Sequence, residues 1–109
     1  MSERHPPPAA AMNGIPDPPS YLDQNLVKRW EELAPIAAKN GSLTPRTADS
    51  FARYIIAEQE YLRAVRRVLA SLRTGNVTDA GQWSMVQDRF FREMQSTSRL
   101  FGLSPDAML

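Results

Sequence analysis

Apolar residues recur at helical spacing in three segments of the chain, and the first segment predicts an amphipathic helix over about 20–39. The members of its apolar stripe lie three or four residues apart: Leu22, Leu26, Trp30, Leu33 and Ala37. Ser20 can cap the start of this helix, with Asp23 as the second member of a capping box. Gly41 suits its end. Pro35 interrupts the stripe and predicts a kink or short break near Leu33.

The second segment predicts one long helix over about 45–73, since no glycine or proline follows Pro45 until Gly75. Thr44 can cap it, and Pro45 suits the first helical position, where no N–H is needed. Its apolar residues keep a three-and-four spacing interrupted by Glu58: Ala48, Phe51, Ile55, Leu62, Val65, Leu69 and Leu72.

A third row of large side chains, Tyr54, Tyr61 and Val68, runs beside this seam at seven-residue spacing. The combined stripe is wider than a two-stranded coiled coil needs. We therefore expect the long helix to be covered both by the chain's own helices and by another subunit. The residues expected at that subunit contact are Tyr54, Tyr61, Leu62, Val65, Val68, Leu69 and Leu72.

The third segment predicts a helix from Ser84 to about 101, after a polar connection at 74–83, "TGNVTDAGQW". Ser84 and Gln87 resemble a capping box. The apolar face of this helix carries Val86, Phe90, Met94, Thr97 and Phe101. Gly102 and Pro105 then end it. The predicted fold is all-α, with a long central helix and a short capped helix on either side.

The first nineteen residues, "MSERHPPPAAAMNGIPDPP", hold most of the nine prolines and few apolar groups. Such a segment cannot repay the entropy of ordering, so we expect a disordered arm at 1–19 and a single folded domain at 20–109. The chain has no cysteine, and its net charge is +1. No apolar run approaches the ~20 residues of a membrane span, so a soluble intracellular protein is expected.

Catalytic and metal-binding patterns are missing from the sequence. The single histidine, His5, lies in the arm, and no P-loop, glycine-rich phosphate loop or paired-histidine zinc motif occurs. We therefore expect no enzyme, no metal and no cofactor.

Arginines cluster on the predicted long helix, whereas the chain as a whole is nearly neutral. Residues 45–73 hold six arginines against three acids, and the stretch "RAVRRVLASLR" has four with no acid. Such a helix face suits contact with phosphates. Arginines late in a helix also simply offset its dipole, so this interpretation stays open. The candidate DNA-binding residues are Arg53, Arg63, Arg66, Arg67 and Arg73.

Two further motifs have alternative interpretations. Residues 31–54 loosely fit a helix-turn-helix, but the second helix is longer than a recognition helix usually is. Trp30, at helical spacing, is expected in the core. Trp83 is expected either over a helix junction or at a subunit contact, and the sequence does not choose between them.

Several short motifs in order resemble the P27 family of tailed-phage small terminase subunits, over about residues 18–106. After a proline-rich lead-in come Trp30 with "LAP" at 33–35, the "GSLT" turn at 41–44 with Asp49 and Tyr54 beyond it, and "LFGLSP" at 100–105. The resemblance implies a ring-forming, helical, non-enzymatic protein of about eight to ten copies.

The resemblance also implies partners. It indicates binding to double-stranded viral DNA at the packaging-initiation region, and recruitment and regulation of the large terminase subunit, which carries the ATPase and nuclease. The protein would act in the host cytoplasm, away from membranes and outside the mature virion. The helix terminator becomes a docking segment, with Phe101, Leu103 and Pro105 held against a neighbouring element or subunit. The alternatives are a helical interaction module without DNA binding and a small helix-turn-helix repressor.

Overall fold

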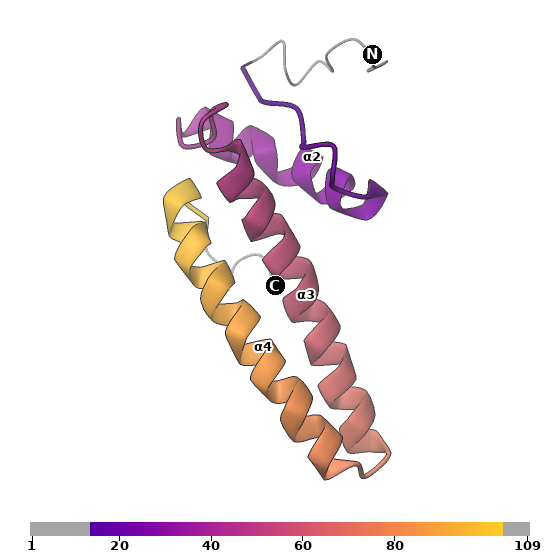
Figure 1. The fold of residues 1–109 in the computed structure, drawn as a ribbon. Coiled ribbons are helices and arrows are strands. Elements are labelled where there is room, and N and C mark those ends of the chain that lie inside the picture. Colours follow the sequence, from indigo (N-terminus) through magenta and orange to yellow (C-terminus); the bar gives the residue numbers. More distant parts are fainter. Residues whose placement is uncertain (1–13, 104–109) are drawn as a thin grey trace.

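Three α-helices make up most of the computed structural model, which describes residues 14–103. They are α2 (Gln24–Lys39), α3 (Ala48–Arg73) and α4 (Val77–Ser98), and a short 3-10 turn, η1 (Arg99–Phe101), follows α4 (Figure 1). No strand occurs within residues 14–103. The all-α fold with a long central helix is therefore confirmed.

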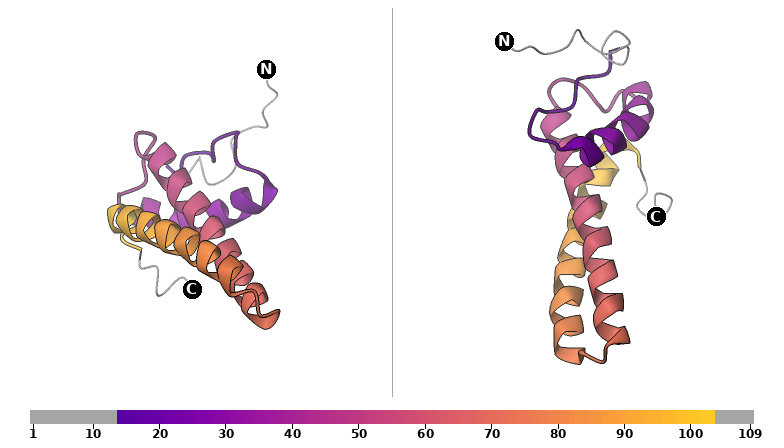
Figure 2. Two further views of the ribbon diagram at one scale, coloured as in Figure 1. Left: turned by 60° about the horizontal axis from the view of Figure 1, so that its bottom comes forward. Right: turned by 90° about the vertical axis from the view of Figure 1, so that its right-hand side faces the viewer.

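α3 and α4 form an antiparallel hairpin, and α2 lies across only one end of it. That end is built from the beginning of α3 and the end of α4, while the other end of the hairpin projects beyond α2 (Figure 1, Figure 2). The principal extents are 51 × 30 × 18 Å. We call the part covered by α2 the head, and the remainder the distal hairpin.

The hydrophobic core lies in the head. Phe51 of α3 is fully buried at its centre, with its ring centroid 4.9 Å from Trp30 of α2 and 4.9 Å from Phe101 of η1, both in edge-to-face geometry. Met94 of α4 is also fully buried. The aromatic contacts thus join α2, α3 and the C-terminal turn around one residue.

α2 begins later than expected and continues through its proline. The cap is Asp23, whose carboxylate accepts a hydrogen bond from the Leu26 N–H at 2.9 Å; Ser20 lies outside the helix. Pro35 stands inside α2 and is exposed. Of the expected kink or short break near Leu33–Ala34, the break was wrong, because α2 is continuous from Gln24 to Lys39. Pro35 has no N–H, so the backbone carbonyl four residues earlier has no helical donor. Because this side of α2 is exposed, that carbonyl can bind water.

α3 also begins later, at Ala48, because residues 44–47 form a closed turn. The Thr47 hydroxyl donates to the Ser42 carbonyl at 2.7 Å and accepts from the Thr44 N–H at 2.9 Å. These bonds satisfy the backbone of the turn and leave Pro45 and Arg46 outside the helix. The expected start at Pro45 was therefore three residues early.

The largest difference from the sequence-based prediction concerns α4. The expected connection at 74–83 is confined to Thr74, Gly75 and Asn76, and α4 begins at Val77. Asn76 is the cap, and its side-chain oxygen accepts from the Asp79 N–H at 3.0 Å. Gly81, which suggested a loop, lies inside the helix at a cost of about 1 kcal/mol relative to alanine. α4 has 22 residues, so it is not the short helix that was expected.

The C-terminal glycine ends the helix as expected and docks onto the chain itself. Gly102 has φ +66°, and a Cβ there would lie 2.8 Å from the Asn40 side-chain nitrogen. That nitrogen donates to the Phe101 carbonyl at 2.9 Å. The end of η1 is therefore fastened to the turn that follows α2. Pro105 lies outside the described residues.

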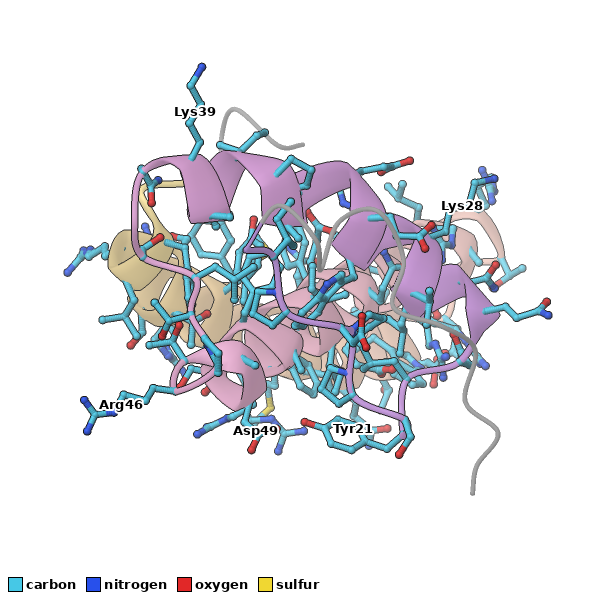
Figure 3. All side chains as sticks on the ribbon, turned by 90° about the horizontal axis from the view of Figure 1, so that it is seen from above. Tyr21, Lys28, Lys39, Arg46 and Asp49 are labelled. Atoms are coloured by element: carbon cyan, nitrogen blue, oxygen red, sulfur yellow. The ribbon has the colours of Figure 1, made fainter. Side chains whose placement is uncertain are left out.

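Part of the expected arm packs onto the head. Ile15 is buried, and the Trp30 indole N–H donates to the Pro16 carbonyl at 3.3 Å. Tyr21 reaches α3, where its hydroxyl donates to Asp49 Oδ1 at 3.0 Å (Figure 3). Residues 14–19 therefore have a packed position, whereas residues 1–13 lie outside the described part of the chain.

Candidate interfaces on the helical hairpin

An uncovered row of apolar side chains runs along the distal part of α3. We call Leu62, Val65, Leu69 and Leu72 the apolar stripe. Leu69 is 52% exposed and Leu72 is 56% exposed, while Leu62 and Val65 are half-buried. Glu58, four residues before Leu62 on the same side of α3, is covered by Arg29 of α2. The apolar stripe thus continues the side of α3 that α2 covers in the head, where no element of residues 14–103 covers it (Figure 2).

The other three residues expected at the subunit contact face the chain's own core. Tyr54 is fully buried in the head. The Tyr61 ring lies 5.5 Å from Phe91 of α4, and Val68, one heptad further, is half-buried. This row is therefore used within the chain. Of the seven expected contact residues, only Leu69 and Leu72 are more than half exposed, and Leu62, Val65 and Val68 are partly exposed.

α4 packs against a row of small residues on α3 that separates two sides of the hairpin. Ala57, Ala64 and Ser71 are buried at seven-residue spacing, and the Ser71 hydroxyl bonds to Asp79 of α4 at 2.5 Å. The apolar stripe lies on one side of this row. By helix geometry Arg53 and Arg67 lie on the other side.

The predicted arginines occupy three different settings. Arg53 is bonded to Glu93 of α4 at 2.9 Å, and the Arg67 guanidinium lies 5.0 Å from the centre of the Trp83 ring. Arg63 is exposed, 3.7 Å from Glu60. Arg66 and Arg73, both exposed, adjoin the apolar stripe on its outer edge because they lie four residues after Leu62 and Leu69. Arg53 and Arg67 are thus beside α4, and the expected single outward face is divided.

Two arginines of α4 complete a basic surface that the sequence reasoning missed. Arg89 and Arg53 border an open groove of about 320 Å³ between α3 and α4, whose apolar lining includes Ile56 and Phe90. Arg92 and Arg89 border the adjoining depression. The charge count followed α3 alone, so these residues were overlooked. Their spacing of three residues places them on one side of a helix, which is the signal that was available.

Trp83 has a defined position between the two helices. It is half-buried within α4 and supports Arg67, so it lies at the α3–α4 contact and not in a loop. Trp30 is 1% exposed in the head, which confirms its expected place in the core. Phe101 is also fully buried in the head, which leaves no surface of its side chain for a partner. Leu103 packs partly against the same core.

A buried ion pair joins α2 to α3 in the head. Glu58 is 1% exposed and accepts two hydrogen bonds from Arg29, at 2.7 and 2.9 Å. Glu32, on the surface, takes a third at 2.8 Å. The bonds to Glu58 raise the pKa of Arg29, which therefore stays charged. This ion pair links α2 to α3 and helps to fix the angle at which the two helices cross.

The Tyr54 hydroxyl lies next to this pair and has no hydrogen-bond partner among the described residues. Burial, followed by the charge of the Glu58 carboxylate, raises the pKa of Tyr54 to about 12, and the charge of Arg29 partly opposes this shift. The unfolded tyrosine ionises near pH 10 and the folded one near 12. The raised pKa therefore stabilises the fold fully below pH 10, and this contribution is lost as the pH rises to 12.

Replacing Tyr54 by phenylalanine is expected to remove that alkaline loss. From pH 9.5 to 12 the wild type should lose about 2 kcal/mol more stability than Tyr54→Phe. At pH 7 the variant should be at least as stable, because no buried hydroxyl is left without a partner. Urea unfolding at both pH values measures this, with Tyr61→Phe as the control. Parallel losses in wild type and Tyr54→Phe would contradict the assignment.

The described residues offer no other kind of site. Within residues 14–103 no group of three or more histidine, cysteine or acidic side chains could hold a metal ion. None of the helices is long and apolar enough to cross a membrane. The surface of the hairpin combines exposed arginines, aromatic rings and an uncovered apolar stripe, and the fold is that of a small all-α protein.

The family of the chain follows from sequence comparison. The sequence model of the family described as phage terminase, small subunit, matches residues 27–108, about three quarters of the chain. The match includes all of α3, α4 and η1 and most of α2. The chain belongs to the phage terminase small subunit family. No curated protein and no solved structure matches it.

Proposed function

We propose that this chain is a small terminase subunit of the P27 type, an oligomeric adaptor without catalytic activity of its own. It binds double-stranded viral DNA at the packaging-initiation region and recruits and regulates the large terminase subunit, which carries the ATPase and nuclease. It does so in the host cytoplasm and is not retained in the mature virion. The observation that carries the proposal is the family match over residues 27–108, which spans the whole hairpin.

Oligomerisation through the apolar stripe is part of this proposal. Leu69 and Leu72, three residues apart, are each more than half exposed; exposing them to water costs free energy, so covering them favours association. Arg66 and Arg73 border the stripe, so an antiparallel two-fold pairing of stripes would bring like charges together. A head-to-tail contact avoids this repulsion and closes into a ring. We propose a ring, and its size of about eight to ten copies rests on the resemblance to the P27 family alone.

Placing two carboxylates in the stripe is expected to break the assembly. The double variant Leu69→Glu/Leu72→Glu should weaken the subunit contact at least about 100-fold, because each buried leucine contributes about 1.5–3 kcal/mol. Light scattering on a sizing column over a concentration series should show its mass falling to that of one or two chains.

Met85→Glu/Leu100→Glu is the matched control, since these side chains are 73% and 61% exposed and lie outside the stripe. It adds the same charge and should keep the wild-type mass. An unchanged mass of the stripe variant, or a monomeric wild type, would remove the stripe as the interface.

DNA retention by the wild type tests the adaptor function itself. Affinity for a duplex carrying the packaging-initiation region should fall steeply between 50 and 200 mM salt, because arginines displace condensed counterions. Binding of the purified large subunit, and a change in its ATPase rate, test recruitment. No DNA retention at low salt would favour the interaction module without a nucleic-acid role.

The repressor alternative draws little support from the geometry. The connection between α2 and α3 covers residues 40–47, longer than the three or four residues of a helix-turn-helix. At the start of α3, Asp49 accepts from Tyr21 and Arg53 is held by Glu93. Arg46 is left as the exposed cation there, and it points away from the body, as do Lys28 and Lys39 on α2 (Figure 3).

A further inference from the structure

The fold divides the hairpin arginines into two groups that face different surroundings. Arg67 of α3 stacks over Trp83, Arg89 of α4 lines the groove between α3 and α4, and Arg92 lies beside Arg89 on the outward side of α4. We call these three the arginine face. Arg66 and Arg73 adjoin the apolar stripe, and Arg63 lies between the two groups on the outer side of α3. A subunit seated on the stripe would cover Arg66 and Arg73 and leave the arginine face open.

The charges of the arginine face are not compensated within the described chain. Arg67, Arg89 and Arg92 are exposed, and none forms an ion pair with a carboxylate of residues 14–103. Arg53 and Arg63, in contrast, each have a carboxylate within 4.0 Å. Arg89 and Arg92 line one depression, so their like charges repel one another, and the face gains most from a ligand that brings several negative charges.

Aromatic rings hold two of these guanidiniums in place. Arg67 lies over Trp83 at 5.0 Å, and Arg89 lies over Phe90 at 5.1 Å. A stacked guanidinium keeps its N–H donors at the rim of the ring free, and less side-chain entropy is lost when it binds. The planar fork of arginine matches the oxygens of a phosphate group. These two side chains are therefore preorganised for phosphate contacts.

The length of the face fits a nucleic-acid backbone. α3 and α4 run antiparallel, so Arg67 lies near the distal end beside Trp83, and the Arg53–Glu93 pair marks the other end (Figure 1). Fourteen residues of α3 separate these points, which is about 21 Å along the helix. Successive phosphates of one DNA strand are 3.4 Å apart along the duplex axis, so the face can follow about six of them.

We propose that the arginine face, Arg67, Arg89 and Arg92, is the DNA-phosphate contact of each subunit, whereas Arg66 and Arg73 belong to the subunit interface. This inference rests on the proposed DNA-binding function and deepens it. It assigns α4 a role in DNA contact and withdraws two arginines of α3 from that role.

Two triple variants of equal charge test the assignment. Arg67→Gln/Arg89→Gln/Arg92→Gln is expected to bind duplex DNA about tenfold or more weakly on any sequence, with the slope of log affinity against log salt reduced by about 3 per bound subunit. Lys28→Gln/Lys39→Gln/Arg46→Gln, at exposed positions of the head outside both surfaces, loses the same three charges and should keep the wild-type affinity and slope per assembly. Light scattering and circular dichroism check the mass and helicity of both proteins.

The outcomes separate this inference from the proposed function. If the wild type fails to retain DNA, the function is wrong. If the wild type binds and the second triple loses as much affinity as the first, the assignment of the face is overturned and the function stands. Unchanged DNA affinity of the first triple, with loss of large-subunit binding, would make the face a protein contact and overturns the inference. Should the first triple misfold, Arg89→Gln/Arg92→Gln leaves the Trp83 contact intact. It should also weaken DNA binding, with the salt slope reduced by about 2 per bound subunit.

Discussion

Replacing Glu58 by glutamine is expected to lower the free energy of unfolding by about 3 kcal/mol. The carboxylate is buried and accepts two hydrogen bonds from Arg29, whose guanidinium would then face an uncharged amide in the head. Removing one member of a buried pair costs about 3–5 kcal/mol, since the other charge is left without compensation. The lower end is expected here because Arg29 is 22% exposed and keeps its bond to Glu32.

Glu32→Gln is the matched control, because Glu32 binds the same arginine from the surface and is 53% exposed. It should change stability by less than about 0.5 kcal/mol. Urea unfolding followed by circular dichroism measures both variants. The double variant Arg29→Met/Glu58→Met should regain most of the loss, because apolar side chains of similar length replace both charges. If Glu32→Gln lowered the free energy of unfolding as much as Glu58→Gln, the buried Glu58 would not be the main partner of Arg29.

Truncating Phe51 to alanine is expected to destabilise the fold by about 3–5 kcal/mol. Its ring is fully buried and contacts Trp30, Tyr54 and Phe101, so the cavity would lie where α2, α3 and η1 meet. In a domain of this size such a loss approaches the whole stability.

Phe51→Leu keeps the result measurable if the alanine variant does not fold, with an expected loss of about 1–1.5 kcal/mol. Phe90→Ala is the control, because Phe90 is only half-buried beside the open groove and should lose less than Phe51→Ala. Thermal unfolding of the three proteins gives the order. If Phe90→Ala were the more damaging variant, the core would have to be centred on the distal hairpin.

The helices were predictable where local chemistry acts alone. The spacing of apolar residues gave the existence of all three helices, and Gly41, Gly75 and Gly102 end them with positive φ as expected. The starts were less predictable, because several capping residues stand near each one. Asp23 and Asn76 cap α2 and α4, although Ser20 and Ser84 offered equally good local signals. Packing of the hairpin decides in favour of the longer α4.

The surfaces were predictable only in part, because they depend on which sides the helices turn toward one another. The row of Tyr54, Tyr61 and Val68 is as apolar as the stripe, and only the position of α4 shows that the chain uses it internally. Arg89 lies across the groove from Arg53, and Arg92 borders the adjoining depression beside Arg89. Such non-local pairing has no periodic signature in the sequence. Tyr21, Asp49 and the buried Arg29–Glu58 pair were missed for the same reason.

Because α2 covers only part of α3, we expect unfolding to be more cooperative in the head than in the distal hairpin. In the head, contacts join segments far apart in the chain, such as Asn40 and Phe101, 61 residues apart. The distal hairpin is closed by the short turn at 74–76, so its contacts are local in sequence and can open without unfolding the head. Substitutions in the distal hairpin should therefore add independently to those in the head. Binding at that end can be altered by mutation while the core that holds the chain together is left intact.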